Sequence, residues 1–178
     1  MSKALIMTGN LVQDHEFIYP YYRLKEAWYD ITVATKDGKE AKGYFGTKVP
    51  PDNGCEVVSW DDTTEEGFDL LLIPGGAKCM EYMRQSFHLM EVIGEFYKQN
   101  KTIASICHGA QMLISAKVVP GRFISGYYSI KDDIENAGAV YSDSAAVVSD
   151  NIITCPHYKY IGEWMRRVIG AGNEDSDN

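Results

Sequence analysis

Short apolar runs alternate along the chain with stretches whose apolar residues recur at helical spacing. A run of apolar or β-branched residues between polar ones predicts a buried strand. Apolar residues at every third or fourth position predict an amphipathic helix. Strands are therefore expected at 3–8, 30–35, 55–60, 68–76, 101–106, 121–127 and 145–155. Helices are expected at 14–29, with Pro20 in a first turn or at a kink, and at 86–100, 108–117, 130–138 and 160–170.

This alternation predicts an α/β fold with a mainly parallel sheet covered by helices on both faces. Residues 1–170 are expected to form one domain, with a small hairpin or loop excursion among the glycines and prolines of 40–60. Residues 171–178, "AGNEDSDN", are acidic and predict a disordered tail. Ligands of such folds bind beyond the carboxyl ends of the strands. Two turns lie there, Pro74–Gly76 and Cys107–Gly109.

Composition narrows the classes of function. The formal net charge of −8 and the scattered basic residues argue against a nucleic-acid partner. No apolar segment approaches membrane-spanning length, and the N-terminus does not read as a signal peptide. The four cysteines are widely spaced without a CxxC pair, which favours reduced thiols and a cytoplasmic location. No GxGxxG or phosphate-binding loop is present, so no cofactor is expected.

The stretch "SICHG" places Cys107 at a predicted strand-to-helix turn between the small residues Ser105 and Gly109. Such a turn exposes a nucleophile above the sheet edge, and a helix N-terminus favours a thiolate. The amides after Cys107 and at Gly75 and Gly76 are candidates for an oxyanion pocket. The alternative is a buried packing thiol, the commoner fate of a cysteine. The adjacent His108 and the small flanking residues favour the nucleophile.

Five ordered segments, "EFIYPYYRLKEA", "LLIPGG", "ASICHGAQMLISA", "SIKDDIENAGA" and "EWMRR", resemble the ThiJ/PfpI superfamily, in particular its PfpI branch. The resemblance covers nearly the whole chain. It implies a flavodoxin-like three-layer sandwich of the class I glutamine amidotransferase type, with a nucleophile-elbow cysteine. It also implies assembly as a homodimer or a homohexamer.

The resemblance assigns a role to four residues. Cys107 matches the family nucleophile, His108 the histidine directly after it, and Glu16 the acid that hydrogen-bonds the thiol. Glu81 matches a glutamate that reaches the histidine across a subunit interface, although the loop "GGAKCMEYMR" is one residue longer here. Both glutamates could instead be helix N-terminal acids that complement a helix dipole.

One segment departs from the family pattern. Where the family has an Arg-x-Pro-x-Asp-like sequence, this chain reads "TCPHYKY". His157 in this segment is expected at the rim of the pocket or in its packing. Cys155 and His157 alone are weak evidence for a metal site, because structural and catalytic sites use three or four ligands.

Three functions remain open. The first is glutathione-independent glyoxalase III and deglycase chemistry on small 2-oxoaldehydes through a Cys107 hemithioacetal, which the resemblance implies. The second is a cysteine peptidase that uses Cys107, His108 and Glu81 on peptide substrates. The third is a redox sensor or chaperone without catalysis, in which Cys107 is oxidised. Aldehyde chemistry is preferred because it needs only a small pocket and the Cys–Glu–His set.

Overall fold

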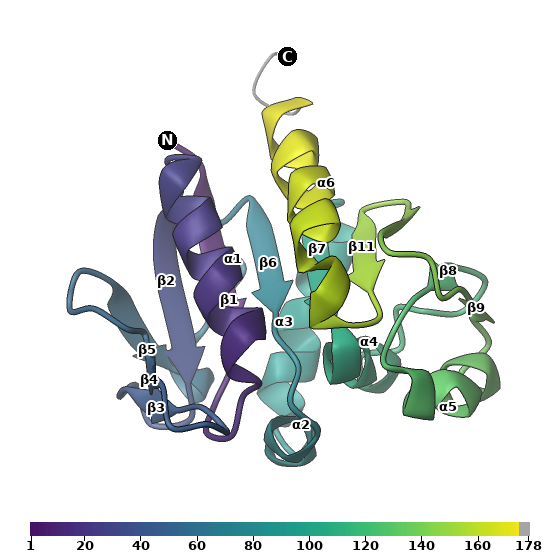
Figure 1. Ribbon diagram of the computed structural model, residues 1–178, viewed down its shortest axis with the longest axis horizontal. Helices are drawn as coiled ribbons and strands as arrows, with labels where there is room; N and C mark the ends of the chain where they lie inside the picture. The colour runs from purple at the N-terminus through teal and green to yellow at the C-terminus, as the bar shows by residue number, and fades with distance from the viewer. Residues whose placement is uncertain (175–178) are drawn as a thin grey trace.

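The computed structural model describes residues 1–174, and its centre is a seven-stranded sheet (Figure 1). The strand order is β10-β11-β7-β6-β1-β2-β5, and every neighbouring pair is parallel except the β10–β11 hairpin. The strands of this sheet are β1 (Lys3–Met7), β2 (Asp30–Thr35), β5 (Glu56–Ser59), β6 (Leu70–Ile73), β7 (Thr102–Ile106), β10 (Val147–Ser149) and β11 (Ile152–Cys155). The predicted mainly parallel α/β sheet is confirmed.

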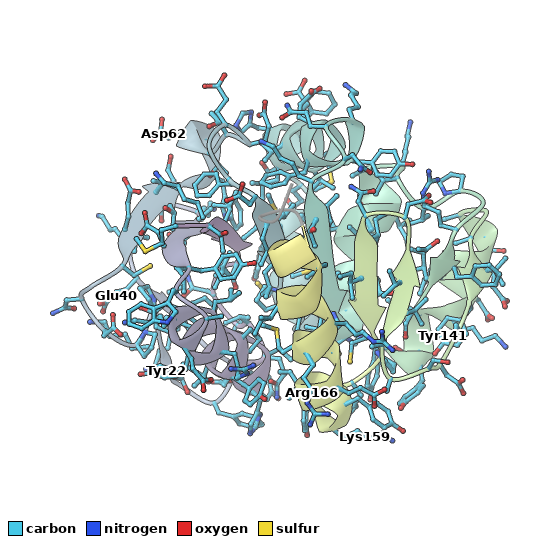
Figure 2. The ribbon with its side chains drawn as sticks, turned by 90° about the horizontal axis from the view of Figure 1, so that it is seen from above. Tyr22, Glu40, Asp62, Tyr141, Lys159 and Arg166 are labelled. Atoms are coloured by element: carbon cyan, nitrogen blue, oxygen red, sulfur yellow. The ribbon has the colours of Figure 1, made fainter. Side chains whose placement is uncertain are left out.

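Helices cover both faces of the sheet. In Figure 1, α1 and α6 lie in front of the strands and α3 and α4 behind them; Figure 2 shows α6 over the middle of the molecule with α1 beside it. The central strands are buried on both faces, which explains their mostly apolar sequences. The helices are α1 (Asp14–Glu26), α2 (Ala77–Met83), α3 (Phe87–Lys98), α4 (Ala110–Ser115), α5 (Lys131–Asn136) and α6 (Ile161–Glu174).

Smaller elements decorate this core. The excursion at 40–60 contains the two-stranded ladder β3 (Ala41–Lys42) and β4 (Lys48–Val49), as predicted. The strand expected at 121–127 is reduced to β8 (Phe123–Ile124), which pairs with β9 (Val140–Tyr141) outside the main sheet. Short 3-10 turns are η1 (Trp60–Asp62), η2 (Cys107–Gly109), η3 (Tyr128–Ile130) and η4 (Tyr158–Tyr160).

Three expectations need correction. The segment after the Gly-Gly turn, expected to be a loop, forms α2. Pro20 lies in the second turn of α1, and the helix continues past it to Glu26. Helix α6 extends to Glu174, so residues 171–174 of the expected tail are helical; residues 175–178 lie outside the described part of the chain. Within the described residues, no helix is both long and apolar enough to cross a bilayer.

Candidate active site

Cys107 lies at the carboxyl end of β7, in a turn that the sequence forces to be tight. Its φ of +59° is in the left-handed region, which side chains other than glycine rarely adopt. A Cβ on Gly109 would lie 2.6 Å from the Ile73 carbonyl oxygen and 2.9 Å from Ser105 Oγ, so only glycine fits there. The predicted nucleophile elbow is confirmed as a backbone conformation.

The Glu16 carboxyl is fully buried against this turn. It enters from the first turn of α1, where the Gln13 side chain accepts a hydrogen bond from the Glu16 amide at 3.1 Å. Its Oε2 accepts a hydrogen bond from the Gly75 amide at 2.7 Å. Its Oε1 is buried without a nitrogen or oxygen partner, and the Cys107 thiol lies beside the carboxyl. A Cβ on Gly75 would come within 2.4 Å of Oε2, so glycine is required for this contact.

Glu16 and Cys107 share a site that tolerates little negative charge. Burial raises the pKa of Glu16 to about 8, although the Cys107 thiol and the Gly75 amide oppose the shift. Burial and the charge of an ionised Glu16 both raise the pKa of the Cys107 thiol. The second contribution vanishes when Glu16 is protonated. At neutral pH the pair therefore carries at most one negative charge, and a thiolate at Cys107 requires the proton on Glu16.

The expected stabilisation of a Cys107 thiolate by amides at the start of the following helix is limited to one amide. The sequence suggested the N-terminus of the following helix, but α4 has only six residues. The one backbone group that lowers the pKa of the Cys107 thiol is the His108 amide. The hydrogen bond with Glu16 raises the pKa of the thiol, so donation from a neutral Glu16 to a thiolate stays a prediction.

His108 is half-buried next to the thiol. Its Nδ1 lies 3.5 Å from Cys107 Sγ, and burial lowers the pKa of the imidazole. The ring stacks on Tyr127 with the centroids 4.8 Å apart. The Tyr127 amide also donates to the Cys107 carbonyl oxygen at 3.1 Å. His108 is therefore held as a neutral base beside the nucleophile.

Sequence reasoning missed Tyr127, which belongs to the same site. The residue follows β8 in a segment without a recognisable motif, so nothing in the sequence singles it out. From Tyr127 the rings continue to His157 at 6.0 Å between centroids, and His157 contacts Tyr158 at 4.2 Å. His157 is thus placed two rings from His108, consistent with the predicted rim position.

Both glycines of the Pro-Gly-Gly turn make close contacts with neighbouring parts of the chain. The Gly75 amide is already bonded to Glu16, so its expected role as an oxyanion donor is wrong for this state of the site. Gly76 has a φ of +105°, and a Cβ there would lie 2.7 Å from the Leu11 carbonyl oxygen. Gly76 therefore allows the loop after β1 to approach; its role toward an oxyanion stays a prediction.

Cys155 and His157 do not form part of a metal cluster. Cys155 Sγ donates to the His157 carbonyl oxygen at 3.3 Å, and His157 Nδ1 accepts from the Lys159 amide at 3.1 Å. Across residues 1–174, no group of three or more histidine, cysteine and acidic side chains could hold a metal ion.

Glu81 is not brought to the site by its own chain. It lies on the exposed side of α2, where its carboxylate pairs with Lys78 at 2.6 Å. Within residues 1–174 no contact joins Glu81 to His108. Its expected role across a subunit interface stays a prediction. If that role exists, Glu81→Gln will lower turnover by roughly tenfold or more by loss of an oriented base. Steady-state kinetics would measure it, with Lys78→Met as control because that variant breaks the same surface ion pair.

An apolar groove of about 780 Å³ runs along the outer side of α1. Its walls include Tyr19, Tyr22, Phe45 and Tyr158, and Figure 2 labels Tyr22 at the edge of the molecule. Phe17 and Tyr21 on the same helix are instead buried in the core. The tyrosine-rich first helix therefore serves both the core and an open surface.

Comparisons with known proteins agree with the fold. The model of the DJ-1/PfpI family matches residues 2–171. Deglycase PfpI from Pyrococcus furiosus is 34% identical over 167 residues, which cover 94% of this chain and 97% of that protein. Protein/nucleic acid deglycase 2 from Escherichia coli is 34% identical over 158 residues, covering 86% and 88% respectively.

A solved structure from Anabaena variabilis, a two-domain protein with DJ-1/ThiJ/PfpI-like and ferritin-like domains, matches with a TM-score of 0.88. The identity is 28%, and the match covers 96% of this chain and 48% of the longer one.

Proposed function

This chain belongs to the DJ-1/PfpI family, and on that premise we propose that it is a cysteine-dependent glyoxalase and deglycase that needs no glutathione. Its substrates are small 2-oxoaldehydes such as methylglyoxal and their early adducts. The observation that carries the proposal is the buried Glu16 carboxyl against Cys107, with Oε2 fixed by Gly75 and Oε1 left without a nitrogen or oxygen partner. The deglycase names of two relatives support the same class.

The reaction starts with proton transfer and addition. The Cys107 sulfur attacks the aldehyde carbon, its proton passes to Glu16, and Glu16 gives its own proton to the oxygen that gains the electron pair, which gives a hemithioacetal. Glu16 is suited to supply that proton, because its pKa of about 8 keeps the carboxyl protonated at neutral pH. The Gly75 amide cannot take this proton, because the amide itself donates a hydrogen bond to Oε2.

Isomerisation and hydrolysis follow. A base removes the hydrogen from the former aldehyde carbon, an enediol forms, and a proton returns to the neighbouring carbon to give a thioester. His108 is neutral and 3.5 Å from the sulfur, so it is suited to accept and return this proton. Water then cleaves the thioester, which releases a 2-hydroxy acid and restores the Cys107 thiol.

Deglycation follows from the same chemistry. Early adducts of amines and thiols with a 2-oxoaldehyde form reversibly and release the aldehyde again. An enzyme that consumes the aldehyde therefore reverses these adducts. No separate site for the modified amine or thiol is required.

Lactate formation from methylglyoxal in the absence of glutathione tests the proposal. We expect turnover without any added thiol, measured by enzymatic detection of D- and L-lactate. We also expect loss of methylglyoxal adducts from N-acetylcysteine at a rate that follows aldehyde consumption. Absence of lactate from a folded protein whose Cys107 still reacts with iodoacetamide would contradict the proposal. Casein cleavage by the same preparation would then favour the peptidase.

A further inference from the structure

A second thiol lies next to the nucleophile across the sheet. Strands β7 and β11 run side by side and parallel (Figure 1), with Cys155 in register with Ile106, the residue before Cys107. Neighbouring strands are about 4.8 Å apart, and disulfides join Cα atoms about 4.4–6.8 Å apart. Cys107 is one residue beyond this register position, which adds about 3.3 Å along the strand, so the Cα atoms of Cys107 and Cys155 are expected roughly 6 Å apart, within the range of disulfides.

Both side chains lie on the same face of the sheet. Thr154 Oγ1 accepts a hydrogen bond from the Ser125 amide on the face that α4 and α5 cover. Because side chains alternate along a strand, the next residue, Cys155, points to the opposite face. Cys107 reaches that face too, since its positive φ turns its thiol toward Glu16 on α1. The charge of an ionised Cys155 raises the pKa of the Cys107 thiol, and the charge of an ionised Glu16 raises the pKa of both thiols, so the three groups lie close together.

The two thiols differ in access. Cys107 is 7% exposed and Cys155 is fully buried. A small oxidant therefore meets Cys107 first, and Cys155 stays reduced behind it. Cys55 and Cys79 are elsewhere: Cys55 donates to the Ile31 carbonyl oxygen at 3.0 Å, and Cys79 contacts Met83 within α2.

We propose that Cys155 is a resolving cysteine, which forms a disulfide with Cys107 after a hydroperoxide has oxidised the nucleophile. The Cys107 sulfur attacks a peroxide oxygen, the O–O bond breaks, and water or an alcohol leaves, which gives a sulfenic acid. The Cys155 sulfur then attacks the Cys107 sulfur, the S–O bond breaks, and the hydroxyl leaves as water with the Cys155 thiol proton. The hydroperoxide accepts the two electrons that the two thiols lose.

The consequence is protection of the nucleophile. A lone sulfenic acid reacts with more hydroperoxide to a sulfinic acid, which thiols do not reduce. A disulfide prevents this further oxidation of Cys107, and reduction of the disulfide restores both thiols. The inference goes beyond the proposed aldehyde chemistry and does not depend on it.

Intact-mass and peptide mapping over a titration from one to many equivalents of hydrogen peroxide test the proposal. In the wild type we expect a loss of about 2 Da, reversed by dithiothreitol, and a non-reduced peptide pair that joins Cys107 to Cys155. In Cys155→Ser we expect a gain of about 32 Da at Cys107 that dithiothreitol does not reverse, at several-fold lower peroxide than in the wild type. Serine keeps a donor toward the His157 carbonyl.

Cys55→Ser is the matched control, because it too replaces a thiol that donates to a backbone carbonyl. It should oxidise as the wild type does. A wild type that goes directly to the irreversible product, or a disulfide that pairs Cys107 with any other cysteine, would overturn the proposal. Peptide mapping of the wild type tests the Cys107–Cys155 disulfide even if Cys155→Ser does not fold, because it needs no variant.

Discussion

Cys107→Ser is expected to reduce lactate formation from methylglyoxal by roughly three orders of magnitude or more, as losses of catalytic nucleophiles do. The serine hydroxyl titrates far above the thiol, and the site already disfavours a second negative charge. The neutral Glu16 carboxyl that can hold a thiolate cannot hold an alkoxide at neutral pH. The measurement is initial-rate kinetics with lactate detection, with the wild type purified in parallel.

The fold should survive this substitution. Serine is smaller than cysteine by little, and the strained φ of +59° is kept by the tight packing of Gly109 and Gly75 around the turn. Cys55→Ser is the control for general effects of thiol loss, since Cys55 lies immediately before β5, where its thiol contacts the Ile31 carbonyl oxygen and not Glu16. Retained turnover in Cys107→Ser would contradict the hemithioacetal mechanism. An equal loss of turnover in Cys55→Ser would indicate that loss of a thiol destabilises the protein.

The strands were predictable from sequence because parallel strands buried on both faces are mostly apolar. Four consecutive apolar residues mark β1 and β6 in this way, whereas Thr102 and Ser105 interrupt the apolar run of β7. Helix α2 was missed because Gly76, at its N-cap position, offers no side-chain cap, and the preceding Pro-Gly-Gly reads as a turn. The strand expected at 121–127 failed for another reason: only two of its residues find a partner, at the edge of the molecule.

The site was predictable as residue types and much less as electrostatics. Small flanking residues marked Cys107, and the resemblance to the family supplied Glu16. The state of that carboxyl depends on Gly75, 59 residues further along the chain, and on complete burial. Neither the contact with Gly75 nor the burial of the carboxyl can be derived from a single sequence. Tyr127 was missed for the same reason, because its role follows from where a loop folds back over the elbow.

Glu16→Gln is expected to lower turnover by roughly a hundredfold or more, the range for loss of a general acid or base. The glutamine oxygen can accept from the Gly75 amide as Oε2 does, and its NH₂ can donate to the thiolate. The variant therefore keeps both hydrogen bonds and loses only the transferable proton. Iodoacetamide labelling of Cys107 should continue while lactate formation stops. Full turnover would instead make Glu16 a positioning residue.

The pH dependence gives a second, independent measure of this carboxyl. Wild-type turnover should fall as the pH rises through about 8, because Glu16 then loses its proton, and the residual activity of Glu16→Gln should lack this fall. Stability should change in the same direction. The folded state holds the proton up to a pKa of about 8, whereas the unfolded chain releases it near the ordinary 4.5.

Between these values the folded state binds more protons, so the free energy of unfolding is highest at acidic pH and declines as the pH rises. The slope is at most about 1.4 kcal/mol per pH unit for one group. Urea denaturation of the wild type and of Glu16→Gln between pH 5 and 9 would measure it. As the pH rises, the free energy of unfolding of the wild type should fall relative to that of Glu16→Gln. The difference between the two values should become constant above about pH 8. A constant difference over the whole range would mean that Glu16 is ionised in the folded protein, and the proton needed at Cys107 would have to come from His108.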